Sequence, residues 1–335
     1  MKHVIFGGDG FVGRHLTKDL LARGQEVVVA DIVQSALPHY GQAKFVACDV
    51  TDAASVAAVP IAADDVVYNL AAKMLSPLQK RADRFSFFWP VNAYGAGNIM
   101  AATASAGGSK LVQFTTDMVY GHTIMSPQTE DHPISPLGEY GASKAAAERF
   151  AGEWRARGMN ISIFRPRLII GPGRLGILEK LFKLVDMHLP VPMIGSGHAP
   201  YQFISVYDCA EAARLAGENG CPNAAFNLGS KNPPSVRGLL GGLIRNAGSK
   251  SILVPTPGFA VKATLGFFDW LNLPIMDPEQ YLIADEHCVR ETDACQRMLG
   301  WQPKHNDIDM LNAAYNEYRA GLRGQKPAVH PVAAE

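Results

Sequence analysis

Short runs of β-branched and other apolar residues alternate with longer segments of helical periodicity through the first half of the chain. The short runs predict strands at His3–Phe6, Glu26–Ala30, Lys44–Ala47, Asp65–Leu70, Lys110–Thr115 and Asn160–Arg165. Apolar residues at helical spacing predict helices between them, at Gly10–Arg23, Asn92–Ala106 and Tyr140–Arg157. This βαβ order predicts an α/β fold with a Rossmann-type, doubly wound parallel sheet, whose ligand sites lie at the carboxyl ends of the strands.

Proline and glycine interrupt the second half of the chain, which predicts a smaller and less regular lobe. A further strand-like run, Ala225–Leu228, indicates that the chain leaves the sheet after Arg165 and returns to make about seven strands. We therefore expect one domain from residues 1–165 and about 201–232, and a mixed α/β substrate lobe from residues 166–200 and 233–320. The tail, residues 321–335, mixes Gly, Pro and small residues without periodicity, which predicts disorder.

Composition adds limits on location and partners. Basic and acidic residues balance at 31 each in 335 residues, which gives no electrostatic reason to expect nucleic acid or an anionic membrane. The five cysteines are scattered without a C-x-x-C pair, and the histidines lack metal-ligand spacing. Neither an apolar leader nor a stretch near the roughly 18 apolar residues of a membrane span is present. We expect a cytoplasmic chain with reduced thiols, no metal, no membrane insertion and a small-molecule ligand.

A glycine-rich turn follows the first predicted strand and opens the first predicted helix. Gly7, Gly10 and Gly13 stand there in the context that a dinucleotide fingerprint requires, with Phe11 and Val12 between them. Such glycines permit a tight turn and let the backbone approach a pyrophosphate, which the helix N-terminus then faces. A glycine-rich turn without any ligand is the simpler alternative.

Asp31 ends the second predicted strand and indicates which dinucleotide binds. An acidic side chain there accepts hydrogen bonds from ribose hydroxyls and repels a 2′-phosphate, and no Arg follows nearby, so NAD is favoured over NADP. An ordinary Asp at the start of a loop is the alternative. Residues at the ends of the next two strands are further cofactor candidates, namely Asp49, Val50, Leu70, Ala71 and Ala72.

Tyr140 and Lys144 stand four residues apart at the start of a predicted helix, which places them on one face. A tyrosine with an ordinary pKa of about 10 is a poor base at neutral pH, so an ammonium that stabilises the phenolate makes acid–base chemistry feasible. Such pairs also recur on exposed helices without any function. Thr116, at the end of the fifth predicted strand, favours the catalytic interpretation because its hydroxyl can hydrogen-bond a substrate oxygen.

In this order, the motifs resemble the extended short-chain dehydrogenase/reductase superfamily of the NAD-dependent epimerase/dehydratase type. The matching pieces are the glycine turn, Asp31, Asn69–Ala72, Asn92, Thr115–Gly121, Tyr140-x-x-x-Lys144, Arg165-Pro166, Gly171–Gly173, Phe203–Asp208 and Leu299–Pro303.

The resemblance implies a role for each catalytic candidate. Tyr140 would be the general acid/base, Lys144 would hold the nicotinamide ribose and lower the Tyr140 pKa, and Thr116 would position the reacting hydroxyl. It also implies cofactor contacts for Asn92, Thr115, Tyr140, Lys144 and Pro166. A homodimer is implied through the helices Asn92–Ala106 and Tyr140–Arg157, where Ala142 and Ala145–Ala147 allow close helix approach.

Departures from the superfamily pattern narrow the expected reaction. Nucleotide-sugar dehydratases follow Thr-Asp with Glu, whereas Met118 follows Asp117 here, which argues against 4,6-dehydration. Nucleotide-sugar epimerases usually carry an Asn and an Arg where this chain has Leu168 and Tyr201, so a diphosphate would be poorly held unless other cations compensate. Those cations are Lys73, Arg167 and Arg174. The candidate substrate contacts are Lys73, Asp117, Met118, Leu168 and Tyr201.

Aromatic clusters in two other segments have two interpretations. The apolar segment Phe259–Ile275 resembles, in its placement, a substrate-covering element of the 3β-hydroxysteroid dehydrogenase branch. Core packing is the default for this segment and for Phe85–Trp89, because aromatic side chains bury large areas wherever they occur. We further expect a solvated face at Glu279–Glu286, a solvated His122 and a structural role for Arg165.

The sequence therefore predicts an NAD-dependent oxidoreductase that transfers hydride at a secondary hydroxyl or ketone. One alternative is an NAD-dependent epimerase of a sugar or nucleotide sugar, which oxidises its substrate only transiently. Another is a non-catalytic NAD-binding regulator, against which the intact Thr116, Tyr140 and Lys144 argue. The expected partners are a small-molecule substrate and a second copy of the chain.

Overall fold

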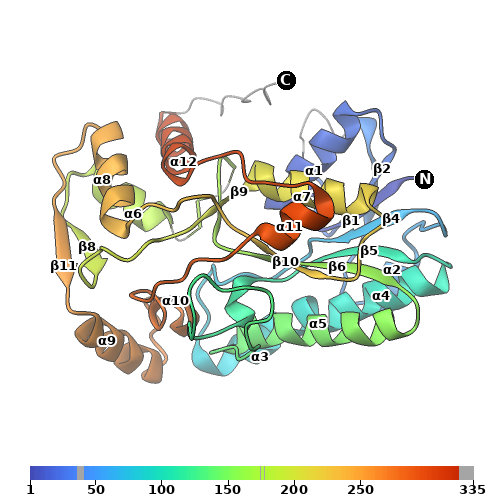
Figure 1. Cartoon of the computed structure of the whole chain (residues 1–335), viewed down its shortest axis with the longest axis horizontal. Helices are drawn as coiled ribbons and strands as arrows, with labels where there is room; N and C mark the ends of the chain where they lie inside the picture. Colours follow the sequence, from blue (N-terminus) through green and yellow to red (C-terminus); the bar gives the residue numbers. More distant parts are fainter. Residues whose placement is uncertain (36–40, 174, 177, 324–335) are drawn as a thin grey trace.

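A computed structural model gives the fold and describes residues 1–35, 41–173, 175–176 and 178–323. Arg174 and most of the predicted tail, residues 324–335, lie outside these ranges. Seven parallel strands form the central sheet in the order β10-β6-β5-β4-β1-β2-β3 (Figure 1). They are β1 (His3–Phe6), β2 (Val27–Asp31), β3 (Lys44–Ala47), β4 (Val66–Asn69), β5 (Lys110–Phe114), β6 (Asn160–Pro166) and β10 (Ala225–Leu228). The predicted fold class is confirmed, and each predicted strand end falls within one residue of the observed one.

Helices cover both faces of this sheet because its central strands are apolar on both sides. The helices on one face are α1 (Phe11–Ala22), α7 (Val206–Glu218) and α11 (Asp293–Leu299) (Figure 1). Those on the other face are α2 (Ala53–Ala57), α4 (Ala96–Ser105) and α5 (Glu139–Ala156). Strand β1 illustrates this burial on both sides. Ile5 packs in the core under α1, α7 and α11, whereas Val4 and Phe6 pack in the core under α2, α4 and α5. The strand order changes direction between β1 and β4, where such sheets place their ligands.

The helix predicted at Asn92–Ala106 begins earlier and is interrupted. It starts as η2 (Arg81–Asp83) and α3 (Arg84–Trp89), passes through the π-helical η3 (Pro90–Gly95) and continues as α4. Pro90 lacks a backbone N–H and its ring displaces the carbonyl one turn back, which explains the wider turn at this point. A last short element before the site is the 3-10 helix η4 (Asp117–Val119).

The second half of the chain builds a smaller group of elements beside the sheet (left in Figure 1). Two short parallel pairs are β7 (Ile169–Ile170) with β9 (Ile204–Ser205), and β8 (Val191–Ile194) with β11 (Leu253–Thr256). The helices are α6 (Leu178–Asp186), α8 (Val236–Asn246), α9 (Gly258–Trp270), α10 (Pro278–Tyr281) and α12 (Asp307–Leu322). A separate apolar core joins α6, α8 and α12. No helix in the described ranges is long and apolar enough to cross a membrane.

The aromatic side chains of Phe259–Ile275 do not form a core, and that default interpretation was wrong. Phe259, Phe267 and Trp270 are 81%, 56% and 66% exposed. Helix α9 is instead fixed by its one buried acid, Asp269, which forms an ion pair with Arg84 of α3. The Phe85–Trp89 cluster is mixed, since Phe88 is buried and Phe85 is half exposed.

Candidate active site

A cavity of about 1310 Å³ lies at the carboxyl ends of β1, β2, β4, β5 and β6 and continues between α6, β8 and α8. This volume exceeds the roughly 300–1,000 Å³ of an ordinary small-molecule site. The cavity can therefore hold a dinucleotide and a second ligand together.

The glycine turn forms the wall of this cavity at the N-terminus of α1. Gly7 has φ +73°, and a Cβ there would lie 2.5 Å from the Ala71 nitrogen. A Cβ on Gly13 would lie 2.3 Å from the Gly7 carbonyl oxygen. Gly10, the N-cap of α1, supplies no side-chain hydrogen bond to the helix. Bare backbone and a helix N-terminus thus face the cavity, which fits the pyrophosphate of a dinucleotide.

Asp31 is held at the end of β2 by two backbone donors. The N–H groups of Asp9 and Ile32 donate to its two carboxylate oxygens at 2.9 and 2.8 Å. Burial raises the pKa of Asp31, although these two hydrogen bonds oppose the increase. The fixed carboxylate lines the cavity together with Asp49 and Val50. In dinucleotide-binding folds, an acidic residue at the end of the second strand binds the adenosine ribose.

Thr116, Tyr140 and Lys144 meet on the wall of the same cavity. The Tyr140 hydroxyl donates to Met74 Sδ at 3.5 Å, and its ring packs edge-on against Phe88. The Lys144 ammonium donates to the Phe114 carbonyl at 3.2 Å. Burial lowers the pKa of Lys144 to about 8, partly offset by Glu148. Thr116 follows β5 as the N-cap of η4, and Tyr140 and Lys144 lie in the first turns of α5, whose buried small residues bring the helix onto the sheet.

All other predicted cofactor and substrate contacts line the cavity except Asn92. The Asn92 amide lies behind the wall, where it bonds both backbone groups of Lys73, at 2.9 and 3.0 Å, and the Ser143 hydroxyl at 3.1 Å. It therefore ties the loop after β4 to α5. The cavity-lining substrate candidates are Lys73, Asp117, Met118, Leu168 and Tyr201.

A buried ion cluster next to Thr116 was not predicted. Arg167 Nη1 and Arg290 Nη2 both donate to the same Asp117 oxygen, at 2.7 and 2.9 Å. Burial acts to raise the pKa of Asp117, but the two guanidiniums outweigh it and the pKa is lowered. Asp117 is therefore an ionised carboxylate at neutral pH.

The run Glu279–Glu286 is not a solvated face, and that expectation was wrong. Glu279 is 2% exposed, and both its oxygens accept the N–H of Gly141, at 3.1 and 2.9 Å. A Cβ on Gly138 or Gly141 would lie 2.6 Å from a Glu279 oxygen, so these two glycines leave the room that the carboxyl occupies. Burial raises the pKa of Glu279 to about 8. Helix α10 is thereby fixed to the N-terminus of α5, beside Tyr140.

Two further expectations concern residues at the edge of the site. Arg165 has the predicted structural role, since it forms two hydrogen bonds with Glu148 and one with the Tyr120 hydroxyl. His122 is exposed but also contacts Glu286 at 2.6 Å.

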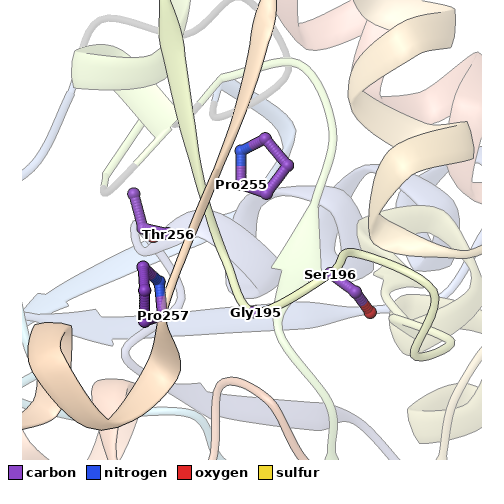
Figure 2. Close-up of a pocket in the computed structure, with 5 residues that line it drawn as sticks. All are labelled: Gly195, Ser196, Pro255, Thr256 and Pro257. Carbon is purple, nitrogen blue, oxygen red and sulfur yellow. The ribbon is translucent and has the colours of Figure 1, made fainter.

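The described part of the chain contains few other groups of residues that could bind a ligand or carry out a reaction. It contains no group of three or more His, Cys, Asp or Glu side chains that could hold a metal. All five cysteines are buried and free. A smaller, open pocket of about 300 Å³ lies where β8 and β11 end (Figure 2), lined by Gly195, Ser196, Pro255, Thr256 and Pro257. These residues have no ionisable side chain, so we assign no chemistry to this pocket.

The parallel sheet, the glycine turn and the Thr-Tyr-Lys wall together define an NAD-dependent enzyme of the extended short-chain dehydrogenase/reductase class. Residues 3–229 match the model of the NAD dependent epimerase/dehydratase family, and the chain belongs to this family. The predicted superfamily, enzyme class and cofactor are thus confirmed.

The proteins that this chain resembles include both dehydratases and epimerases. The Sinorhizobium fredii protein y4nG is 30% identical over 320 residues, covering 95% of this chain and 78% of y4nG. A dTDP-glucose 4,6-dehydratase of Streptomyces griseus is 27% identical over 346 residues, 97% of each chain. The crystal structure of UDP-glucose 4-epimerase from Thermotoga maritima superposes with a TM-score of 0.76 at 20% identity, over 96% of this chain and 100% of that one.

Proposed function

We propose that the chain is an NAD-dependent dehydrogenase that oxidises a secondary alcohol on an apolar molecule, or reduces the corresponding ketone. The observation that carries this proposal is the character of the cavity wall beyond Thr116 and Tyr140. That wall is formed mainly by aliphatic and thioether side chains, among them Leu168, Leu178, Leu181, Leu184, Val191, Met193, Leu239, Leu240, Ile275 and Ile283. Apolar surface of this extent favours an apolar ligand by the hydrophobic effect.

The same wall argues against a nucleotide sugar. A diphosphate needs several charged or N–H donors. Lys73 is exposed and lies over the Phe87 ring, and Lys180 donates to the Ile275 carbonyl. Arg167 shares its charge with Asp117, which leaves one edge of its guanidinium for a single anionic group. Among the described residues, the cations near the substrate half of the cavity are therefore few and partly occupied.

Dehydration is disfavoured by the ion cluster. In the dehydratase pattern that this chain resembles, an Asp and a Glu follow the Thr and handle protons. Here Met118 replaces the Glu, and Asp117 is held ionised between two arginines, so it has no proton to donate at neutral pH.

The proposed roles follow from the geometry. Gly7, Gly10 and Gly13 would hold the pyrophosphate and Asp31 the adenosine ribose. NAD, when bound, supplies the hydride acceptor. Tyr140 would take the proton from the substrate hydroxyl, which Thr116 orients. Other cofactor contacts would come from Phe11, Val12, Asp49, Val50, Leu70, Ala71, Ala72, Thr115, Lys144 and Pro166, with Asn92 holding the loop at Lys73 in place.

Lys144 completes the proposed proton transfer. Its pKa of about 8 leaves the ammonium mostly charged at pH 7. The buried Lys144 charge beside Tyr140 stabilises the phenolate form of Tyr140. Tyr140 reaches this form by releasing its own hydroxyl proton, and it can then accept the proton of the substrate hydroxyl.

The proposal is tested by incubating the purified chain with NAD and separate panels of sterols, simple sugars and UDP-sugars. We expect NADH in amounts equal to the alcohol consumed, with an apolar secondary alcohol as the best substrate. Isomerisation of a UDP-sugar without net NADH would overturn the proposal in favour of the epimerase alternative. NAD binding without any turnover would favour the regulator alternative, and Tyr140→Phe would then change nothing.

We also propose a homodimer formed through the outer surfaces of α4 and α5. Tyr94 is 49% exposed there, and Phe150 and Trp154 are partly exposed. Ala145, Ala146 and Ala147 are already buried within the chain, so of the predicted small residues Ala142 is the one left near the surface. Size-exclusion chromatography with light scattering would test this state.

Two further proposals concern organisation and location. We place the domain boundaries as the sequence predicts, at 1–165 with about 201–232, and 166–200 with 233–320. The separate apolar core of α6, α8 and α12 supports this division, but α11, which lies within the second range, packs on the central sheet. A cytoplasmic location is supported by five cysteines that are buried and free.

A further inference from the structure

A surplus of buried positive charge lies at the reacting end of the cavity. Asp117 is the shared acceptor for Arg167 and Arg290, and all three residues are at most 4% exposed. Among the described residues, no second carboxylate forms an ion pair with either arginine. Within this cluster of three, one negative and two positive charges leave a net charge of one, and a buried charge without an ion-pair partner of its own is costly.

The guanidiniums also have donors to spare. Arg167 Nε, Arg290 Nε and Arg290 Nη1 are buried without a hydrogen-bond partner in the described part of the chain. Arg290 lies over the ring of Tyr120, away from the cavity wall, whereas Arg167 is part of that wall and lies 5.1 Å from the ring centre of Tyr201. Arg167 is therefore the member of the cluster that a ligand in the cavity can reach.

We propose that Arg167 binds a carboxylate of the substrate. This inference rests on the proposed function and makes it more specific, because the substrate becomes a hydroxy acid on an apolar skeleton. The carboxylate would neutralise the surplus charge and accept from the guanidinium edge that Asp117 does not use. Thr116 directly precedes Asp117 in the chain, so the carboxylate would lie near the carbinol and the apolar remainder would fill the space between α6 and α8.

The reaction then balances as a two-electron oxidation. The carbinol loses its hydroxyl proton to Tyr140 and its carbon-bound hydrogen, as hydride, to NAD⁺. The products are a keto acid, NADH and one proton, and the carboxylate stays unchanged on Arg167.

Besides Lys144, which is assigned to the cofactor and Tyr140, two other described cations on the cavity wall are less suited to this role. Lys180 donates to the Ile275 carbonyl at 3.5 Å in an exposed contact, and Lys73 is exposed over the ring of Phe87. Solvent screens exposed charges and weakens the ion pairs that they form. Lys180→Met therefore provides a matched control for the removal of a cation from the wall.

The variant Arg167→Met isolates the proposed contact. Asp117 keeps Arg290 as its partner, so a neutral pair of one acid and one base remains buried. Methionine replaces the volume of the arginine stem without its charge. Arg167→Lys keeps the charge but loses the planar fork, and is expected to restore only part of the binding.

The experiment measures the binding of decanoate and decan-1-ol to the NAD-loaded enzyme by isothermal titration calorimetry. We expect decanoate to bind about 10- to 100-fold more tightly than decan-1-ol, the range for one hydrogen-bonded charged contact. Arg167→Met is expected to remove this difference without weakening decan-1-ol, and Lys180→Met to preserve it.

Each other outcome overturns the inference in a recognisable way. Equal binding of acid and alcohol to the wild type, or a preference that survives Arg167→Met, contradicts the carboxylate site and leaves the dehydrogenase proposal standing. Loss of the preference in Lys180→Met assigns the carboxylate to Lys180 instead. Failure of both decanoate and decan-1-ol to bind contradicts the apolar substrate class and the carboxylate site together.

Discussion

Replacing Glu279 with glutamine is expected to change how the stability of the protein depends on pH. The Glu279 carboxyl is 2% exposed and receives the Gly141 N–H at the start of α5. Burial raises its pKa from an ordinary value of 4.5 to about 8 in the folded chain. The folded state therefore binds a proton more tightly than the unfolded state does, and the stability from this group is lost as the pH rises from about 4.5 to 8.

The magnitude follows from the two pKa values. One pKa unit corresponds to about 1.4 kcal/mol, so the full difference amounts to about 5 kcal/mol across this pH window. At pH 5 the neutral carboxyl and the neutral amide are similar in shape and both accept from Gly141, so the two proteins are expected to be similarly stable. Above pH 8 the wild type has to hold an ionised Glu279, and Glu279→Gln is expected to be more stable by up to about 5 kcal/mol.

Urea unfolding at several pH values between 5 and 8.5 measures this difference. Other groups titrate in the same window, among them Asp307 with a pKa raised by burial to about 6, so only the difference between variant and wild type is informative. Glu26→Gln, at an exposed side chain just before β2 and away from the proposed dimer surface, is the control and is expected to change little at any pH. A stability difference between Glu279→Gln and the wild type that does not change with pH would show that the pKa of Glu279 is not raised in the folded chain.

Three further predictions concern the cofactor and the reaction. Tyr140→Phe is expected to lower kcat by about 10²- to 10⁴-fold in an NADH absorbance assay while NAD affinity stays unchanged; unchanged turnover would exclude Tyr140 as the acid/base. Gly13→Ala places a methyl group 2.3 Å from the Gly7 carbonyl and is expected to weaken NAD binding in a fluorescence titration; wild-type affinity would contradict the glycine cradle. Asp31→Ala is expected to reduce the preference for NAD over NADP in kcat/KM, and an unchanged ratio would remove Asp31 from cofactor selection.

The elements that the sequence predicted well depend on local pattern. Strand β1, the glycine turn and α1 follow one another within about twenty residues, and each has its own periodicity or residue preference. Tyr140 and Lys144 are likewise related by the helical repeat alone. Such features need no knowledge of distant contacts, which is why the sheet and the Thr-Tyr-Lys wall could be expected in advance.

The features that sequence reasoning missed depend on partners far along the chain. Glu279 stands in a run that reads as polar, and it is buried because the glycines at 138 and 141 make room for it. Arg290 gives no local signal, since its partner Asp117 is separated from it by 173 positions. The exposure of the aromatic side chains of α9 was also missed. An apolar composition predicts burial, and the local sequence does not show whether another element packs against the helix. Gly138 and Gly141, beside Tyr140, were the one local clue to a close contact there.

In the proposed reaction, the hydride is transferred from the substrate to the cofactor and is not returned. An apolar secondary alcohol carrying deuterium on its carbinol carbon tests it directly, with the purified chain, NAD and mass spectrometry of both cofactor and alcohol. We expect one deuterium in each released reduced cofactor and one ketone formed for each alcohol consumed. Deuterium that stays with an alcohol of inverted configuration, with no reduced cofactor released, would contradict it.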